Sequence, residues 1–378
     1  MVQTGRLLAG LFWYKFFWLR HGGVITESGG SVADLGEWGL IAAIAARMPP
    51  GPYSRLGIGD DSAVVAAPSG SVVAAVDLLL EGRHFLRSWS SAHDVGVKAA
   101  ARSLADIAAM GAVPTALLVA LAAPGTLPAR WALDLAAGLA AEAGRAGAGV
   151  VGGDTASADS VLISVTALGD LAGRSPVRRA GARPGDVVAV TGPLGHSAAG
   201  HALLAVGVES FPELVAAHLR PAPPYDAGPE AAVVGATAMI DVSDGLLADL
   251  GHVATASGVW IDVESPALAP GATLARAAAA VLSSSSGTNR SGSPDALARE
   301  WVLTGGEDHC LVATFPPAAA LPARWRVIGQ VREPRPDALG APPPRITVDG
   351  TDYEGPPGWQ HFQPTQLTQM NVPFSCLW

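Results

Sequence analysis

Residues 239–263, MIDVSDGLLADLGHVATASGVWIDV, decide the fold class of this chain. A short apolar run at Met239-Ile240 ends in an aspartate, which indicates a strand followed by a polar turn. Apolar residues then recur at helical spacing from Leu246 to Ser257, and a second apolar run follows at Val259–Val263. This strand–helix–strand alternation predicts an α/β arrangement in the second half of the chain.

The first half of the chain mixes the same two kinds of element. Helical spacing predicts helices, the first of them with Asp34 as its N-cap, and short apolar runs predict strands. The expected helices are 34–47, 98–110 and 131–146, and the expected strands are 62–66, 72–76, 117–121, 149–151 and 161–168. With a strand at 187–190 and a helix at 201–206 in the second half, we expect a two-domain α+β or α/β protein.

A polar, glycine-containing connection at 169–183 divides the chain. We therefore expect an N-terminal domain at 32–170 and a C-terminal domain at 180–363, with 1–31 as an extension outside the fold and 364–378 as a tail. The serine-rich stretch 283–293, SSSSGTNRSGS, is expected to be a disordered surface insertion.

The charge balance excludes two common ways of binding phosphates. The 378 residues hold 33 Asp and Glu against 24 Lys and Arg, a net charge of −9, so the chain lacks the cationic surplus of a sequence-independent nucleic-acid binder. Lysine occurs only at Lys15 and Lys98, and neither follows a glycine, which excludes a P-loop. An acidic chain of this kind needs bound cations to hold a polyphosphate.

Two cysteines, Cys310 and Cys376, provide neither a disulfide framework nor a zinc pair, which favours the cytoplasm. The apolar segment 7–19, LLAGLFWYKFFWL, is interrupted by Lys15 and is too short to span a membrane. It has two interpretations: an extension ahead of the folded domain, or a signal-peptide core or interfacial anchor. Because no Ala-x-Ala cleavage site follows, we favour the extension and expect no membrane association.

Carboxylates stand at Gly-flanked positions or at the ends of apolar runs along the whole chain. One such aspartate is typical of a cap or a turn, but a buried carboxylate is unfavourable unless it is paired or binds a metal. Such a number of carboxylates at these positions favours one cluster in the folded protein. Oxygen ligands without Cys select Mg²⁺ or a similar hard cation. Mg²⁺ would then supply the positive charge for phosphoryl transfer that a lysine supplies elsewhere. The residues are Asp60, Asp61, Asp77, Asp106, Asp154, Asp241, Asp244, Glu307 and Asp308.

Seven motifs in chain order make the sequence similar to the thiamine-monophosphate kinase family. Each motif is weak alone, but their order over about residues 32–363 is specific. They are GIGDDSA at 57–63, DLLLEGRHF at 77–85, SLADIAAMG at 103–111, GGDT at 152–155, RAGARPGD at 179–186, DVSDGL at 241–246 and GGED at 305–308.

The resemblance implies a fold and an activity. The fold would be that of the aminoimidazole-ribonucleotide synthetase superfamily. It would have an N-terminal α+β domain, a mixed sheet with helices, that dimerises through its sheet, and a C-terminal α/β sandwich. The activity would be direct, Mg²⁺-assisted, in-line transfer of the γ-phosphoryl group of ATP to thiamine monophosphate, which gives thiamine diphosphate in its biosynthesis. The protein would be a homodimer that binds several Mg²⁺ ions.

Roles for single residues follow from the same resemblance. The implied Mg²⁺ ligands are Asp61, Asp77, Asp106, Asp154, Asp241 and Asp244. The implied ATP contacts are Gly153, Asp154, Arg179 and Ser243, and the implied catalytic residues are Asp154, Asp244 and Arg179. The residues that would face thiamine are His84, Glu307 and Trp359. An arginine suits phosphate oxygens, and a Trp ring suits the cationic thiazolium.

The sequence departs from the family pattern beside the implied metal site. Ala75 and Val76 stand where the family has Ser/Thr-Thr, Ser103 replaces a usual Asn, and His309 replaces a usual Tyr. Two alternatives stay open: another ATP-dependent enzyme of the superfamily, such as a hydrogenase-maturation dehydratase, or a non-catalytic nucleotide-binding protein. A selenophosphate synthetase is disfavoured because it needs a reactive N-terminal cysteine.

Overall fold

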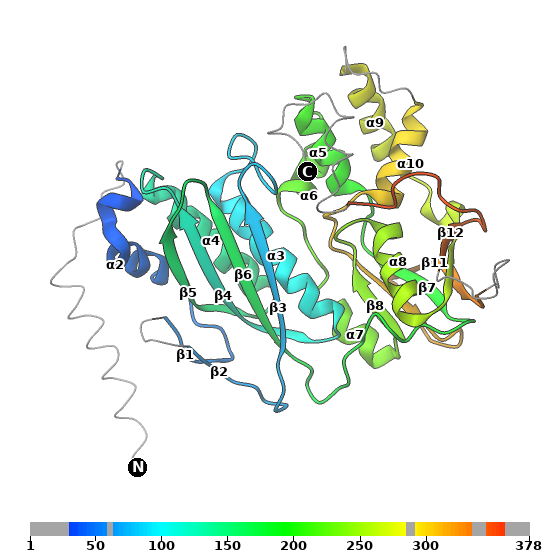
Figure 1. The fold of residues 1–378 in the computed structure, drawn as a ribbon, viewed down its shortest axis with the longest axis horizontal. Helices are drawn as coiled ribbons and strands as arrows, with labels where there is room; N and C mark the ends of the chain where they lie inside the picture. The colour runs from blue at the N-terminus through cyan, green and yellow to red at the C-terminus, as the bar shows by residue number, and fades with distance from the viewer. Residues whose placement is uncertain (1–29, 59–62, 285–291, 335–344, 360–378) are drawn as a thin grey trace.

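The computed structural model describes residues 30–58, 63–284, 292–334 and 345–359. Each half of the chain forms one main sheet with helices packed on it (Figure 1). The expected mixture of sheets and helices in two halves is therefore present. The domain limits 32–170 and 180–363 remain predictions.

The N-terminal sheet has the strand order β3-β6-β4-β5. Its strands are β3 (Val73–Leu80), β4 (Val113–Ala123), β5 (Gly149–Ser157) and β6 (Leu162–Asp170). The helices beside it are α2 (Val32–Ala45), α3 (Ala92–Ala109) and α4 (Ala129–Arg145), and the short strands β1 (Ser54–Leu56) and β2 (Val64–Val65) pair with each other. Strands β4 and β5 are parallel and the other neighbours are antiparallel, so the sheet is mixed, as expected.

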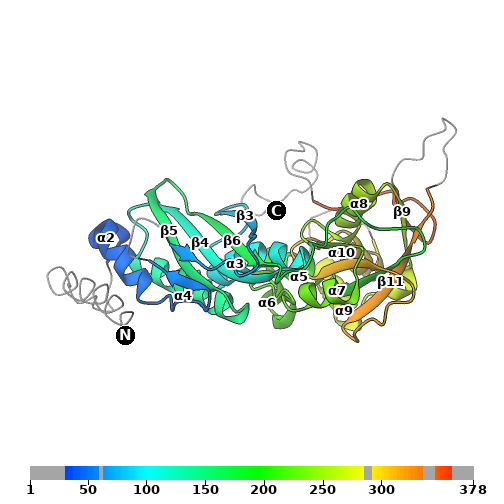
Figure 2. The ribbon, with the colours of Figure 1, turned by 90° about the horizontal axis from the view of Figure 1, so that it is seen from below.

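Helices α3 and α4 lie on one face of this sheet (Figure 2). Ile163, Val165 and Ala167 of β6 face these helices and are fully buried. No described helix covers the opposite face, where Val76 and Leu78 of β3 are 63% and 49% exposed. The sheet thus has one covered apolar face and one open apolar face.

Gly96 of α3 and Gly138 of α4 allow the two helices to approach closely, since a Cβ atom on Gly96 would lie 2.2 Å from the carbonyl oxygen of Leu135. A Cβ atom on Gly138 of α4 would lie 2.1 Å from the carbonyl oxygen of His93, whereas a Cβ on Gly144 would meet nothing within 4 Å. We expect Gly138→Ala to lower the free energy of unfolding by about 1–3 kcal/mol, as overpacking does. Gly144→Ala is the control and should be neutral or stabilising by up to about 1 kcal/mol. Urea unfolding measures both, and equal values would contradict the close helix packing.

The C-terminal sheet has the strand order β12-β9-β11-β7-β10-β8. Its strands are β7 (Val187–Thr191), β8 (Ala238–Asp241), β9 (Trp260–Val263), β10 (Leu311–Phe315), β11 (Trp325–Arg332) and β12 (Arg345–Val348). Neighbours are antiparallel except β9 and β12. The predicted strand–helix–strand unit is β8, α8 (Leu246–Ser257) and β9. Three strands lie between β8 and β9, so α8 belongs to a long crossover connection.

The two halves share one core across their boundary. Leu104 and Ile107 of α3 belong to the same buried cluster as Met239 of β8 and Phe315 of β10. The opposite face of the C-terminal sheet packs in a second cluster with its own helices. These are α5 (His196–Ala205), α6 (Pro212–Leu219), α8, α9 (Ala272–Ser284) and α10 (Pro294–Thr304), while α7 (Ala227–Val234) packs near α3. Helix α3 therefore contacts both sheets. Its polar residues lie at the boundary between the two halves, hereafter the seam.

Several element limits differ from the sequence prediction for identifiable reasons. Helix α2 has Ser31 as its N-cap, and Asp34 is the third residue of that capping box instead of the cap. Strand β3 runs on to Leu80 and β5 to Ser157, so Asp77 and Asp154 lie inside strands and do not end them. Helices α3 and α5 begin at Ala92 and His196, earlier than expected.

The serine-rich stretch lies partly in regular structure, against expectation. Ser283 and Ser284 end α9, and Ser293 is the N-cap of α10, while residues 285–291 lie outside the described part. The sequence prediction also did not assign α6, α7, α9, α10, β10, β11 or β12. Within the described ranges, no helix combines the length and the apolar character that crossing a bilayer requires.

Candidate active site

Helix α3 places three charged side chains on one of its faces. Lys98, Arg102 and Asp106 are spaced four residues apart, so they share a side of the helix. Lys98 is only 2% exposed, and α3 packs against both sheets. Charges in such a place need partners, and the C-terminal half of the chain supplies one.

Glu307 is the partner of both cations. Its Oε2 lies 3.0 Å from Lys98 Nζ, and its Oε1 lies 2.5 Å from Arg102 Nη1. Burial alone would raise the pKa of Glu307, but Arg102 and Lys98 hold that pKa well below its usual range. The carboxylate is therefore ionised, and the three side chains tie α3 to the loop before β10.

The backbone fixes the loop that presents Glu307. This residue has a φ of 66°, in the left-handed region, and its N–H donates to the carbonyl of Ser243 over 2.8 Å. A Cβ on Gly306 would lie 2.5 Å from the same carbonyl, so only glycine fits before Glu307. The Gly-Gly-Glu-Asp motif thus docks on the Asp-Val-Ser-Asp-Gly motif.

Asp77 of β3 lies beside the same face of α3. Ser103 Oγ donates to Asp77 Oδ2 over 2.8 Å, and Arg102 Nη2 is 3.9 Å from Asp77 Oδ1. Asp106 is one turn farther along α3, where burial, together with the negative charges of Asp241 and Asp77, raises its pKa to about 8. That pKa indicates a group of carboxylates with too little positive charge around them.

Asp241, the last residue of β8, is the third aspartate of this group. Asp77, Asp106, Asp241 and Glu307 together form the carboxylate centre. His309 Nδ1 lies 3.0 Å from Asp241 Oδ2, and both residues are buried. Burial alone would lower the pKa of His309, but the hydrogen bond to Asp241 and the charge of Glu307 raise it. His309 thus gives Asp241 a fixed orientation.

The loop after β8 is held by one buried carboxylate. Asp249 Oδ2 accepts hydrogen bonds from the N–H groups of Ser243, Asp244 and Gly245 over 3.0, 3.1 and 3.1 Å. The N–H of Trp359 donates to the carbonyl of Asp244 over 2.9 Å. The loop thus brings Ser243, Asp244 and Trp359 together next to Asp241.

Among the described residues, the predicted metal ligands do not surround one point. In the part of the chain that the structure describes, one trio, Asp244, Asp249 and His252, has ligand atoms within 4.8 Å of one another. Its central residue, Asp249, already binds backbone N–H groups. The charges of Asp77, Asp106 and Asp241 instead act together on Arg102.

Gly153 and Asp154 lie at the other edge of the N-terminal sheet. Asp77 pairs with Val165, Val165 with Val119, and Val119 with Gly153. Three strand spacings, roughly 14 Å, therefore separate the two edges. The Asp154 side chain is exposed and hydrogen bonds to the next N–H of its own strand over 2.8 Å. Within the described part of one copy, Asp154 therefore lies far from Asp77.

Two further predicted residues form hydrogen bonds outside this group of ion pairs, and a third lies outside the described part. Arg179 is exposed in the connection between the two halves, where its carbonyl accepts from Ser257 Oγ over 3.0 Å. His84 follows β3 and accepts at Nδ1 from the N–H of Leu80 over 3.0 Å. Asp61 falls in the undescribed residues 59–62.

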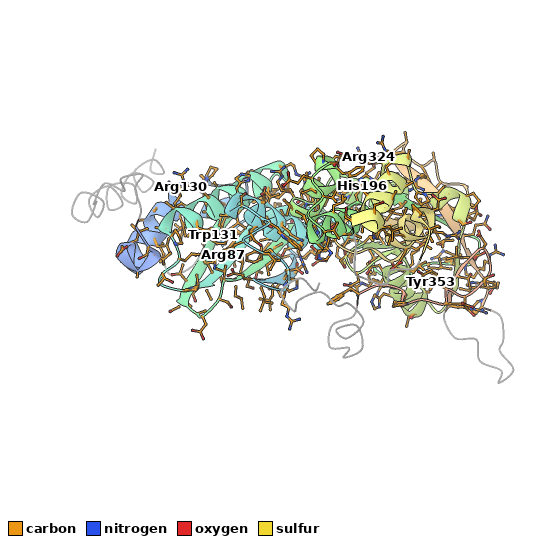
Figure 3. The ribbon with its side chains drawn as sticks, turned by 90° about the horizontal axis from the view of Figure 1, so that it is seen from above. Arg87, Arg130, Trp131, His196, Arg324 and Tyr353 are labelled. Carbon is orange, nitrogen blue, oxygen red and sulfur yellow. The ribbon has the colours of Figure 1, made fainter. Side chains whose placement is uncertain are left out.

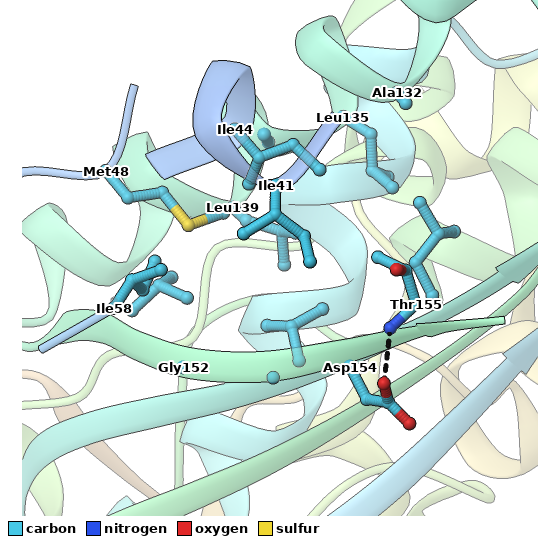
Figure 4. Close-up of a pocket in the computed structure, with 15 residues that line it drawn as sticks. Ile41, Ile44, Met48, Ile58, Ala132, Leu135, Leu139, Gly152, Asp154 and Thr155 are labelled. Atoms are coloured by element: carbon cyan, nitrogen blue, oxygen red, sulfur yellow. Dashed lines mark hydrogen bonds between the residues drawn. The ribbon is translucent and has the colours of Figure 1, made fainter. Parts of the chain in front are cut away.

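An apolar pocket of about 110 Å³ opens on the helix side of β5, next to Gly153 (Figure 4). Ile41 and Ile44 of α2 and Leu135 of α4 line it, and Asp154 points to the opposite side of the strand. Sequence patterns do not predict this pocket, because its walls are ordinary apolar residues of separate elements.

Known proteins with similar sequences identify the family. The AIR synthase related protein N-terminal domain family matches residues 59–171, and the corresponding C-terminal domain family matches residues 183–309. The thiamine-monophosphate kinase of Mycobacterium tuberculosis is 48% identical over 332 residues, which are 88% of this chain and 93% of that protein. This chain belongs to the thiamine-monophosphate kinase family.

Solved structures of the thiamine-monophosphate kinase family share the fold. The structure described as AaThiL complexed with AMPPCP and TMP is 33% identical, with a TM-score of 0.67 over 89% of this chain and 100% of that chain. The hydrogenase maturation protein HypE also aligns, with 18% identity and a TM-score of 0.62 over 86% of this chain and 98% of its own. That second likeness shows the fold alone. The family resemblance and the expected architecture are thus confirmed.

Sequence reasoning missed three residues of this thiamine-monophosphate kinase family member. Lys98 was noted only for its lack of a preceding glycine, and neither Arg102 nor Asp249 was assigned a role. The available signal was the spacing of Lys98, Arg102 and Asp106 in a helix otherwise rich in Ala and Leu. Charges at every fourth position of such a helix indicate a buried polar stripe.

His218, a buried histidine near Lys98, is expected to make the folded protein less stable in acid. Burial lowers the pKa of His218 on α6 well below 6.5, and the charges of Lys98 and His201 act in the same direction. Protons therefore bind the unfolded chain preferentially once the pH falls below about 6.5, and stability declines by up to about 1.4 kcal/mol per pH unit. Urea unfolding between pH 5 and 8 should show a shallower decline for His218→Gln than for the wild type. Parallel curves would contradict the assignment.

Proposed function

We propose that this chain transfers the γ-phosphoryl group of ATP to thiamine monophosphate and releases thiamine diphosphate and ADP. The observation that carries the proposal is the group of Asp77, Asp106 and Asp241 around Arg102, in a chain 48% identical to a thiamine-monophosphate kinase. The ligands named for the AaThiL complex, AMPPCP and TMP, support the same pair of substrates.

The donors of this centre suit Mg²⁺. They are carboxylate oxygens, which this hard cation prefers, and the raised pKa of Asp106 supports a need for added positive charge. The proposed ligands are Asp77, Asp106, Asp241 and Asp244, together with Asp61 and, from a second copy, Asp154. When bound, Mg²⁺ neutralises the charge of the polyphosphate and stabilises the transfer. Removal of the metal with EDTA should abolish turnover.

The apolar pocket beside β5 is the proposed site for the adenine ring of ATP. Ile44 and Leu135 offer apolar walls to a flat ring, and Gly153 has no side chain between its backbone and the phosphates. Asp154 stands at the edge of the pocket. Arg179 and Ser243 are proposed to contact the phosphates, since a guanidinium and a hydroxyl suit phosphate oxygens.

A second copy of the chain would complete the site. Leu78, Ser164, Ala120 and Asp154 pair in one row across the N-terminal sheet, so Asp154 shares the open face with Leu78. Exposed apolar side chains on that face are typical of a protein interface. We propose a homodimer through this face, in which Asp154 of each copy reaches the aspartates of the other.

The thiamine moiety is proposed to lie against Trp359 and His84. The Trp ring offers a cation–π contact to the thiazolium, and its backbone bond to Asp244 keeps it next to the centre. Glu307 is also proposed to face thiamine, with its carboxylate oriented by Lys98 and Arg102. Because the acceptor phosphate is already ionised at neutral pH, the chain needs to orient the two substrates and needs no general base.

The proposed compartment is the cytoplasm. Cys310 is a buried free thiol, and free thiols with few other cysteines are typical of reducing compartments. Cell fractionation with an antibody to the full chain checks this placement.

Turnover of thiamine monophosphate tests the function. The purified protein with Mg²⁺ and ATP should form thiamine diphosphate and ADP in equal amounts, separated by chromatography. Asp241→Asn is the matched control, because an asparagine keeps the shape at this position and removes the charge. Binding of ATP without any thiamine diphosphate at saturating Mg²⁺ would overturn the proposal.

A further inference from the structure

Arg102 stands where carboxylates of both halves of the chain meet. Its side chain is 13% exposed, its Nη1 lies 2.5 Å from Glu307 Oε1, and its Nη2 lies 3.9 Å from Asp77 Oδ1. The negative charges of Asp241 and Asp106 act on it as well. A single guanidinium thus pairs with carboxylates of β3 and of the loop before β10, and it lies in the field of two more from α3 and β8.

Lys98 also links α3 to the C-terminal half, but Arg102 reaches a carboxylate in each half. Lys98 contacts Glu307, and His309 contacts Asp241, but each of these carboxylates belongs to the C-terminal half. Arg102 has ion pairs with a carboxylate of the N-terminal sheet and with one of the C-terminal half. The carboxylates would repel one another across the seam if this charge were absent.

The sequence of β3 before Asp77 makes the charge of Arg102 more important for holding Asp77. Ala75 and Val76, which precede Asp77, have no side-chain oxygen to share a cation. The two oxygens of Asp77 already face α3, one toward Ser103 and the other toward Arg102. The position of Asp77 is therefore set from the helix before any cation arrives.

We propose that Arg102 is a positioning residue that acts as a built-in counter-ion of the carboxylate centre. It orients Asp77 and Glu307 toward each other and lets the seam close before Mg²⁺ binds. The proposal rests on the Mg²⁺ site of the proposed function, but its test needs no turnover.

The test compares Arg102→Met and Arg102→Lys in thermal unfolding of the full chain, in EDTA and in saturating Mg²⁺. Arg130→Met is the control, because Arg130 is 74% exposed at the start of α4 and pairs with Asp134 on the surface (Figure 3). In EDTA, Arg102→Met should lower Tm by roughly 5 °C or more, while Arg130→Met leaves it almost unchanged. The rise in Tm on adding Mg²⁺ should be larger for Arg102→Met than for the wild type, and close to the wild type for Arg102→Lys.

A second measurement separates charge from packing. Adding Asp77→Asn to Arg102→Met should restore part of the lost Tm in EDTA, because it removes one of the repelling charges. If Arg102→Met does not fold in EDTA, recovery of folding by Mg²⁺ or by Asp77→Asn supports the proposal in the same way.

Three results would overturn the inference. The first is an equal rise in Tm on adding Mg²⁺ for Arg102→Met and Arg102→Lys. The second is no recovery of Tm when Asp77→Asn is added to Arg102→Met. The third is failure of both Arg102→Met and Arg102→Lys to fold under every condition. Absence of any Mg²⁺ response in the wild type would remove the Mg²⁺ site and this inference together. Loss of turnover with a normal Mg²⁺ response would count against the proposed function alone.

Discussion

Glu307→Gln should lower the free energy of unfolding by about 3–5 kcal/mol, measured by urea unfolding at neutral pH without metal. The substitution leaves Lys98 and Arg102 buried at the seam without their shared carboxylate, and breaking a buried ion pair from one side has a penalty of that size. The geometry supports the high end of this range, since both contacts are short and the Lys98 and Glu307 side chains are 3% and 4% exposed.

The matched control for this prediction is Glu81→Gln. Glu81 pairs with Arg87 over 2.5 Å, but the Arg87 side chain is 43% exposed, and a surface pair of this kind contributes at most about 1 kcal/mol. A loss in Glu307→Gln no larger than that in Glu81→Gln would show that the three charges at the seam do not hold the two halves together.

Asp154→Asn should lower kcat by about 100-fold or more without changing Tm. The side chain is exposed and accepts a hydrogen bond from the N–H of its own neighbour in β5, so we expect that folding does not depend on its charge. A carboxylate that helps to hold the charge-neutralising metal at the reacting phosphates has an effect of that order. Asp244→Asn should act in the same way, and near wild-type turnover in both variants would contradict the role of the carboxylates.

Mixed dimers show where Asp154 acts. If it completes the centre of the other copy, a mixture of the Asp154→Asn and Asp241→Asn variants should recover up to about a quarter of wild-type activity. After exchange, half the dimers contain one subunit of each kind, and one of the two sites in each such dimer is intact. Two variants that stay inactive after mixing, although they exchange subunits, would place Asp154 outside the site of the partner.

The aspartates of the centre were predictable because they interrupt apolar patterns. Asp106 falls in a helix rich in Ala and Leu, and Asp241 ends the apolar run of β8. The strand–helix–strand unit at 239–263 was equally plain from its spacing. Local patterns of this kind depend on residues close in the sequence, which is why sequence reasoning found them.

Strand order and long-range pairs were not predictable from such patterns. The sequence places Asp77 and Asp154 on strands but does not say that β3 and β5 are opposite edges of one sheet. The pairing of Arg102 with Glu307 joins residues 205 positions apart. The extent of β3 was missed because Asp77 breaks its apolar run, and the hydrogen bond from Ser103 that stabilises it there is a tertiary contact.

The fate of the γ-phosphoryl group tests the central claim most directly. Purified protein is given ATP labelled at the γ-phosphate, Mg²⁺ and thiamine monophosphate, and the products are separated with time. Direct transfer predicts that the label enters the terminal phosphate of thiamine diphosphate in step with ADP, with no labelled protein. Label that appears as free phosphate, or that stays on the protein, while thiamine monophosphate remains unchanged would contradict the account.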